Sequence, residues 1–102
     1  MRHTENEIRV IALKILKDID GQFYRENCID SIMFDEKDKI SRGVDKGKVK
    51  PTWTIFIKSL FDNEDHLVIS DETGEPVYYQ NFNYIIREIG KDANGKYYRI
   101  KD

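Results

Sequence analysis

Residues 52–60 read TWTIFIKSL, and this stretch carries the strongest strand pattern in the chain. It interleaves aromatic and β-branched residues with threonine, a composition that favours the pleated, half-buried surface of a sheet. Side chains alternate across a strand, so this segment has two faces. One face carries Trp53, Ile55 and Ile57, and the other carries Thr54, Phe56 and Lys58. A single helix can cover only one of them, which leaves Phe56 on the other.

A helix is predicted upstream of this strand, over about residues 5–20. Thr4 and Glu7 have the spacing of a capping box, in which each side chain satisfies a free backbone N–H at a helix start. Apolar residues then recur at intervals of three and four, at Ile8, Ile11, Ala12, Ile15 and Ile19. Gly21 suits a left-handed helix stop. This amphipathic pattern is typical of a helix that lies across a sheet.

The remainder of the chain alternates short apolar runs with turn residues. Connectors such as FDNED, DETGE and KDANG have the composition that hairpin turns require. Residues 82–89 fit a helical stripe as well as a strand, and we favour the strand because a bulged hairpin turn follows it. The predicted strands span about residues 28–34, 52–60, 66–70, 76–80, 84–89 and 96–101.

Residues 35–50 interrupt this pattern with mixed charges and two glycines, and they show no sustained period. We interpret them as a long, mobile loop that can hold a short strand around Ile40. The sequence therefore predicts one domain over residues 1–102, of the α+β class. In it one N-terminal amphipathic helix packs on one face of an antiparallel meander of about five strands.

The amino-acid composition limits the classes of partner and cellular location that we expect for this protein. The chain has 102 residues, of which 35% are charged, 39% hydrophobic and 12% aromatic, a balance typical of a folded globular domain. A net charge of −2 disfavours nucleic acid as a partner. The single cysteine, Cys28, predicts no internal disulfide and a buried apolar role. The amino terminus lacks a signal-peptide core and no run is long enough to span a membrane, so we expect a cytoplasmic protein and no membrane partner.

Meander geometry predicts a charged rim at one end of the sheet, because loops 35–50, 71–75 and 90–96 should meet there. Its acids are Asp35, Glu36, Asp38, Asp71, Glu72, Glu75 and Asp92, with lysines among them. Two interpretations stay open: an ordinary solvated rim and a partner-binding one. Neither DETGE nor DNED has the ligand spacing of a calcium loop, so no metal site is predicted.

Strand parity also predicts an apolar row on the face away from the helix. If Trp53, Leu67, Ile69, Val77 and Tyr79 point toward the helix, the opposite face carries Phe56, Val68 and Tyr78, joined by Tyr97 or Tyr98. An uncovered aliphatic and aromatic patch with a charged edge is typical of protein interfaces. The alternative is that loop 35–50 or strand curvature covers the row.

The sequence contains no recognisable group of catalytic or metal-binding residues. His3 and His66 are the two imidazoles, the first terminal and expected to be mobile, the second placed at a turn beside two acids. No C-x-x-C, H-E-x-x-H or phosphate-binding glycine loop occurs in the chain. The sequence therefore indicates no catalytic residue, metal ligand or cofactor.

Three features in this order carry a family resemblance: the amphipathic helix, the W-x-I-x-I strand at Trp53 to Ile57, and LVISDETGEPVYY at 67–79. Together they resemble small α+β immunity proteins of bacterial polymorphic toxin systems, some of which have a cystatin-like sheet. The D-x-T-G-E turn is also similar to that of PepSY-type domains, which are exported, and the missing export signal counts against this comparison. The first resemblance implies a cytoplasmic inhibitor that binds one toxin.

The resulting hypothesis is a protein-binding module that acts as a stoichiometric inhibitor. The candidate contacts are Phe56, Val68 and Tyr78 on the sheet, or Asp71, Glu72 and Glu75 at the rim. An alternative is a small-molecule-binding or hydrolytic domain, with a pocket between helix and curved sheet lined by Trp53 and Tyr79. A homodimer that buries the open face is the third possibility.

Overall fold

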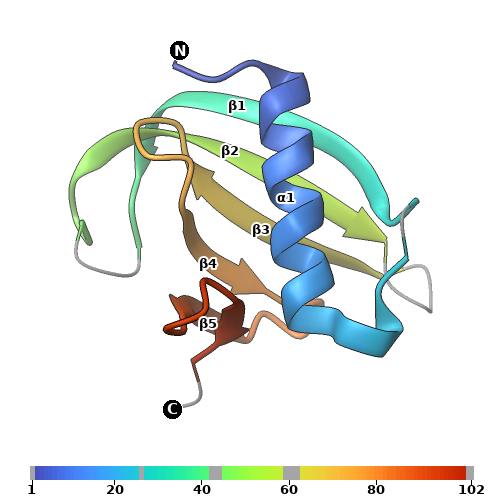
Figure 1. The fold of residues 1–102 in the computed structure, drawn as a ribbon. Helices are drawn as coiled ribbons and strands as arrows, with labels where there is room; N and C mark the ends of the chain where they lie inside the picture. Colours follow the sequence, from blue (N-terminus) through green and yellow to red (C-terminus); the bar gives the residue numbers. More distant parts are fainter. Residues whose placement is uncertain (1, 26, 42–44, 59–62, 101–102) are drawn as a thin grey trace.

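The computed structural model describes residues 2–25, 27–41, 45–58 and 63–100. One long helix lies across one face of a six-stranded antiparallel sheet whose strand order follows the sequence (Figure 1). This confirms the α+β class with an N-terminal helix, and the strand count is six rather than about five. The elements are α1 (Glu5–Asp20), η1 (Gly21–Phe23), β1 (Ile29–Lys39), β2 (Val49–Lys58), β3 (Glu64–Ser70), β4 (Pro76–Gln80), β5 (Ile86–Lys91) and β6 (Tyr97–Arg99).

The start of α1 has both bonds of the capping box. The Glu7 backbone N–H donates to Thr4 Oγ1 over 3.1 Å, and the Thr4 N–H donates to Glu7 Oε1 over 2.8 Å. At the other end Gly21 has φ 54° and donates its N–H to the Lys17 carbonyl. A positive φ at this position is readily adopted only by glycine, so the residue ends the helix.

The core lies between α1 and the sheet. The helix contributes Ile8, Ala12, Ile15 and Leu16, and the strands contribute Trp53, Ile55, Ile57, Leu67, Ile69 and Tyr79. The inward parity of Trp53 is therefore confirmed. Trp53 and Tyr79 are each 4% exposed and belong to this core.

The prediction of a loop over residues 35–50 is wrong at both ends of that range. Strand β1 continues to Lys39 and β2 already begins at Val49, with a register shift between Asp35 and Asp38. Charged side chains at a sheet edge leave the backbone free to pair, so side-chain composition concealed the strand. At the base of the hairpin connection, Ile40 donates its N–H to the Lys48 carbonyl over 2.9 Å and is 4% exposed. Residues 42–44 lie outside the described part of the chain.

The ambiguous segment 82–89 is partly strand and partly turn. Strand β5 begins at Ile86 and pairs with β4 through Gln80 and with β6 through Tyr98. The five residues before it, 81–85, form the connection between β4 and β5. In the described part of the chain, no helix has the length and apolar character needed to cross a membrane.

Candidate functional site

The face of the sheet away from α1 is called the open face here. Cross-strand pairing places residues of five strands in one row across it, namely Met33, Thr54, Val68, Tyr78 and Glu88. The neighbouring row contains Ser31, Phe56, His66, Gln80 and Ile86. Neither row belongs to the core that contacts α1. The open face is therefore built by alternation along the strands, as the sequence of β2 indicates.

The three sheet residues singled out from the sequence lie on this face but differ in exposure. Phe56 and Tyr78 are half-buried, while Val68 is 2% exposed because it is flanked by Thr54 and Tyr78 in its own row. The Phe56 ring meets the His66 ring edge-on, with centroids 4.7 Å apart. Phe56 and Tyr78 can thus contact a partner, and Val68 supports them from below.

Two further apolar side chains extend the open face toward its edges. Met33, on the edge strand β1, is 59% exposed. Tyr98 is 47% exposed and pairs with Gly90, where an added Cβ would lie 2.6 Å from the tyrosine ring. Tyr98 is therefore the tyrosine that joins the apolar row, whereas Tyr97 is buried on the helix side.

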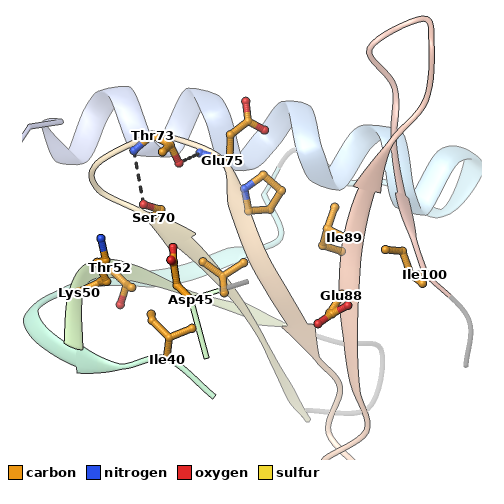
Figure 2. Close-up of a pocket in the computed structure, with 12 residues that line it drawn as sticks. Ile40, Asp45, Lys50, Thr52, Ser70, Thr73, Glu75, Glu88, Ile89 and Ile100 are labelled. Carbon is orange, nitrogen blue, oxygen red and sulfur yellow. Dashed lines mark hydrogen bonds between the residues drawn. The ribbon is translucent and has the colours of Figure 1, made fainter. Parts of the chain in front are cut away.

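A groove of about 400 Å³ lies where the open face meets the charged rim (Figure 2). Its lining comprises Ile40, Asp45, Lys50, Thr52, Ser70, Thr73, Glu75, Pro76, Val77, Glu88, Ile89 and Ile100. Apolar walls and hydroxyl groups therefore alternate with carboxylates. Thr52 is 1% exposed, and its hydroxyl donates to Asp38 Oδ2 over 2.8 Å, which fixes one wall.

Most charges around the groove are already paired. Lys50 Nζ lies 3.1 Å from Glu72 Oε1, and Lys48 Nζ lies 3.3 Å from Asp45 Oδ1. Glu75 accepts from Lys91 over 3.4 Å and from the Tyr97 hydroxyl over 3.1 Å. The Glu88 carboxylate differs, because it makes no hydrogen bond or ion pair to any other residue that the structure describes.

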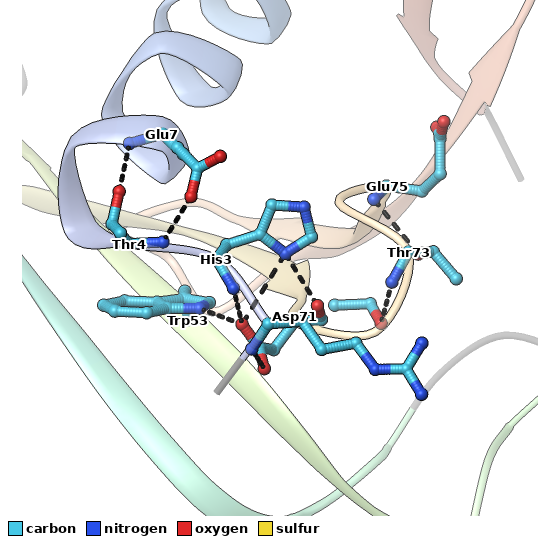
Figure 3. A network of polar contacts seen from close by, with 9 residues as sticks. His3, Thr4, Glu7, Trp53, Asp71, Thr73 and Glu75 are labelled. Atoms are coloured by element: carbon cyan, nitrogen blue, oxygen red, sulfur yellow. Dashed lines mark hydrogen bonds and ion pairs between the residues drawn. The ribbon is translucent and has the colours of Figure 1, made fainter.

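Asp71 holds the segment that precedes α1 (Figure 3). Its carboxylate accepts the Arg2 N–H over 2.7 Å, the His3 N–H over 3.0 Å and the Trp53 Nε1–H over 2.8 Å. The His3 Nδ1 lies 2.7 Å from the Asp71 carbonyl oxygen, which can only accept, so Nδ1 carries the ring proton. His3 is therefore tied down, and the expectation that it is mobile is wrong.

Burial acts to raise the pKa of Asp71, but the hydrogen bonds from Trp53, Arg2 and His3 outweigh it and hold the pKa below the usual range of an aspartate. The side chain is 1% exposed. The expectation that Asp71 offers a carboxylate at the rim is therefore corrected: this residue joins the chain start to the sheet. Glu72 and Glu75 remain at the rim, 34% and 51% exposed.

The remaining reactive residue types have ordinary structural surroundings. Cys28 is 7% exposed, and burial raises the pKa of its thiol, as expected for an apolar packing role. His66 Nε2 lies 3.7 Å from Glu64 Oε1 at the surface. Among the residues that the structure describes, no three His, Cys, Asp or Glu side chains gather closely enough to hold a metal ion.

The connection between β4 and β5, residues Asn81–Ile85, was missed as a candidate and is called the aromatic loop. It exposes Phe82 by 45%, Tyr84 by 81% and Ile85 by 46%. The Asn81 side chain accepts the N–H groups of Asn83 and Ile85 over 2.9 and 3.0 Å, so the loop is ordered. Tyr84 has φ 63°, a conformation that costs a bulky residue energy. Asn81 and Asn83, two turn-favouring residues at a spacing of two, are the sequence signal that could have indicated this loop.

Comparison with family models, with curated proteins and with solved structures gave no match for this chain. The open face, the groove and the aromatic loop are therefore the features from which a function can be inferred.

Proposed function

We propose that the chain is a protein-binding module that uses its open face to occlude one partner. In its sharper form the proposal is an immunity-type inhibitor that binds a bacterial toxin stoichiometrically in the cytoplasm. The observation that supports it is the pair of half-buried rings, Phe56 and Tyr78, on a sheet face that no helix of the described residues covers.

The composition of this face supports docking over simple exposure to water. An antiparallel sheet face that stays in water is normally polar, so large apolar side chains there favour a cover supplied from outside. Tyr, Phe and Met are enriched in the centres of protein interfaces, and charged residues at their margins. Met33, Phe56 and Tyr78 correspond to such a centre, and the lysines and acids of the rim to its margin.

The aromatic loop continues the same surface. The row that contains Phe56 passes through Gln80 and Ile86, which flank this loop on either side. An ordered loop loses little conformational entropy when it docks, so its exposed Tyr84 is suited to anchor a partner. Inhibition by occlusion needs no reactive group, only a rigid surface that covers the partner's active site.

The proposal is tested by capture with matched variants. Wild-type protein, Phe56→Ala, Tyr78→Ala and the control Val10→Ala are immobilised and exposed to lysate of the host cell. Val10 is 70% exposed on α1, on the opposite side of the molecule. We expect one protein to be retained by the wild type and by the control, and its retention to fall about tenfold with either ring removed.

The captured protein must then behave as a target. Mixed with the purified chain, it should form a complex of equal stoichiometry and lose its own activity as the complex forms. Capture that is indifferent to Phe56 and Tyr78, or a complex in which the captured protein stays fully active, would contradict the proposal. Circular dichroism of each variant checks that the fold is intact.

A small-molecule-binding domain is the second candidate, and the groove is the observation that favours it. Its volume of about 400 Å³ lies within the range of about 300–1,000 Å³ that small-molecule sites occupy. Such a site would lie at the rim rather than between helix and sheet. A ligand in the groove would raise the melting temperature of the wild type and of Tyr78→Ala equally, because Tyr78 does not line the groove.

A further inference from the structure

We propose that the groove receives a lysine or arginine side chain of the protein partner, with its charged end at Glu88. The inference rests on the proposed function, because it names the part of the partner that the chain recognises. Three properties of the groove support it: the sign of its charge, the unpaired state of Glu88, and the apolar character of its walls.

The charge of the lining is negative. Three carboxylates, those of Asp45, Glu75 and Glu88, face a single ammonium group, that of Lys50. Lys50 is itself paired with Glu72, 3.1 Å away. Lys48, Lys91 and Glu72 neutralise the other three charges of the lining, so the carboxylate of Glu88 remains, and a cationic ligand meets a more favourable field than an anionic one.

Glu88 provides the specific contact. Cations already lie beside Asp45 and Glu75, at 3.3 and 3.4 Å, while the Glu88 carboxylate lacks a partner in the described part of the chain. Figure 2 shows the Glu88 side chain among the residues that surround the groove. The Glu88 side chain is exposed, so a ligand can reach its carboxylate. A guanidinium or ammonium group would give this carboxylate charge-assisted hydrogen bonds.

The walls suit the aliphatic part of the same side chain. Ile40, Val77 and Ile100 line the groove together with Pro76. Lysine and arginine place their methylene stems against apolar surfaces of this kind while the charged end meets a polar group. The hydroxyl oxygens of Ser70 and Thr73 have lone pairs that can accept further N–H groups, of which arginine offers five.

The test is an NMR titration of the isotope-labelled chain with N-acetylarginine methylamide, alongside its neutral counterpart built on citrulline. The arginine compound should shift the backbone amide signals of Thr52, Val77, Glu88 and Ile100 in a saturable way. Its citrulline counterpart keeps the shape and loses the charge, and should bind about fivefold more weakly or not at all.

Two variants complete the design. Glu88→Gln should weaken binding of the arginine compound about threefold to tenfold. Glu36→Gln makes the same change at an exposed position of β1 outside the groove and should leave binding unchanged. Equal binding of the citrulline compound, an unchanged affinity of Glu88→Gln, or shifts confined to other surfaces would overturn the inference.

Failure here is distinguishable from failure of the proposed function. The titration needs no protein partner, and the capture experiment depends on Phe56 and Tyr78, neither of which lines the groove. If capture requires Phe56 and Tyr78 but the arginine compound does not bind the groove, the docking face is supported and the cation site is rejected.

Discussion

Asp71 shows how much one side chain can contribute to this fold. Its carboxylate accepts from the backbone at both Arg2 and His3 and from the indole of Trp53. These donors lie 69, 68 and 18 residues away in sequence. No local pattern in DETGE could indicate them, which is why sequence alone placed Asp71 in an exposed turn.

Substitution of this carboxylate should be costly. In Asp71→Asn the amide nitrogen would face N–H donors, so buried hydrogen bonds are lost while the shape is kept. We expect the free energy of unfolding to fall by about 2–3 kcal/mol, measured by urea denaturation at pH 7. The matched control Glu36→Gln, at an exposed position, should change it by less than about 0.5 kcal/mol. Equal effects of the two substitutions would argue against the role assigned to Asp71.

The pH dependence follows from the lowered pKa of Asp71. A carboxyl group whose pKa is lower in the folded state than in the unfolded state stabilises the fold above the unfolded value, about 3.9 for an aspartate. This contribution is lost as the pH falls through the folded pKa. The stability difference between wild type and Asp71→Asn should therefore be full at pH 6 and shrink below about pH 4. A difference that grows on acidification would have the wrong sign for this explanation.

At the scale of elements, the aromatic loop combines order with strain. Asn81 holds two backbone N–H groups of the loop, while Tyr84 adopts φ 63° with its ring 81% exposed. A strained, exposed aromatic residue in an ordered loop is more easily explained by binding than by stability.

Exchange of Tyr84 for asparagine separates the two effects. Asparagine tolerates positive φ, so Tyr84→Asn should raise the free energy of unfolding by about 0.5–1 kcal/mol. The same variant should bind the partner more weakly, because an exposed ring is removed. Urea denaturation measures the free energy of unfolding, and capture measures binding of the partner.

As a contrast, Tyr98→Asn exchanges the same residue types within strand β6 and should lower the free energy of unfolding. A stability loss in Tyr84→Asn would show that the loop is not strained.

Element boundaries also mark the limit of the sequence prediction. The helix could be located because its capping box and apolar spacing are local signals, and β2 because its side chains alternate. The sequence prediction ends strand β1 at Phe34, because Asp35, Asp38 and Lys39 pair with β2 through their backbone while their side chains are polar. Their partner strand, β2, lies across a hairpin, and amino-acid composition does not indicate which strands pair.

For the molecule as a whole, parity placed Phe56, Val68 and Tyr78 on one face correctly, but exposure depends on neighbours. Val68 is buried in its row, and the groove is lined jointly by Ile40, Val77 and Ile100. These residues come from three separate parts of the chain. A pocket made this way has no sequence motif, so the groove could not be predicted.

Recognition of a partner should depend on rings more than on surface charges. Tyr78→Ala should weaken the purified complex about tenfold or more, and Glu72→Ala less than about threefold, because Glu72 is partly exposed and already paired with Lys50. Isothermal titration calorimetry measures both. Sedimentation at several concentrations identifies the alternative of a second copy of the chain on this face. A larger loss for Glu72→Ala would shift the interface to the rim.

The hydrogen bonds that Asp71 accepts from Arg2, His3 and Trp53 affect how the protein can be immobilised for the binding experiments. His3 packs against Gly74, within 3.1 Å of where a Cβ would stand, in the turn that carries Thr73 and Glu75. Ile100 lines the groove. Both residues are therefore unsuitable points for attaching a tag or a surface. Immobilisation through a thiol introduced as Arg9→Cys, on the outer surface of α1, keeps the sheet unobstructed. The native thiol of Cys28 is buried and would stay unlabelled.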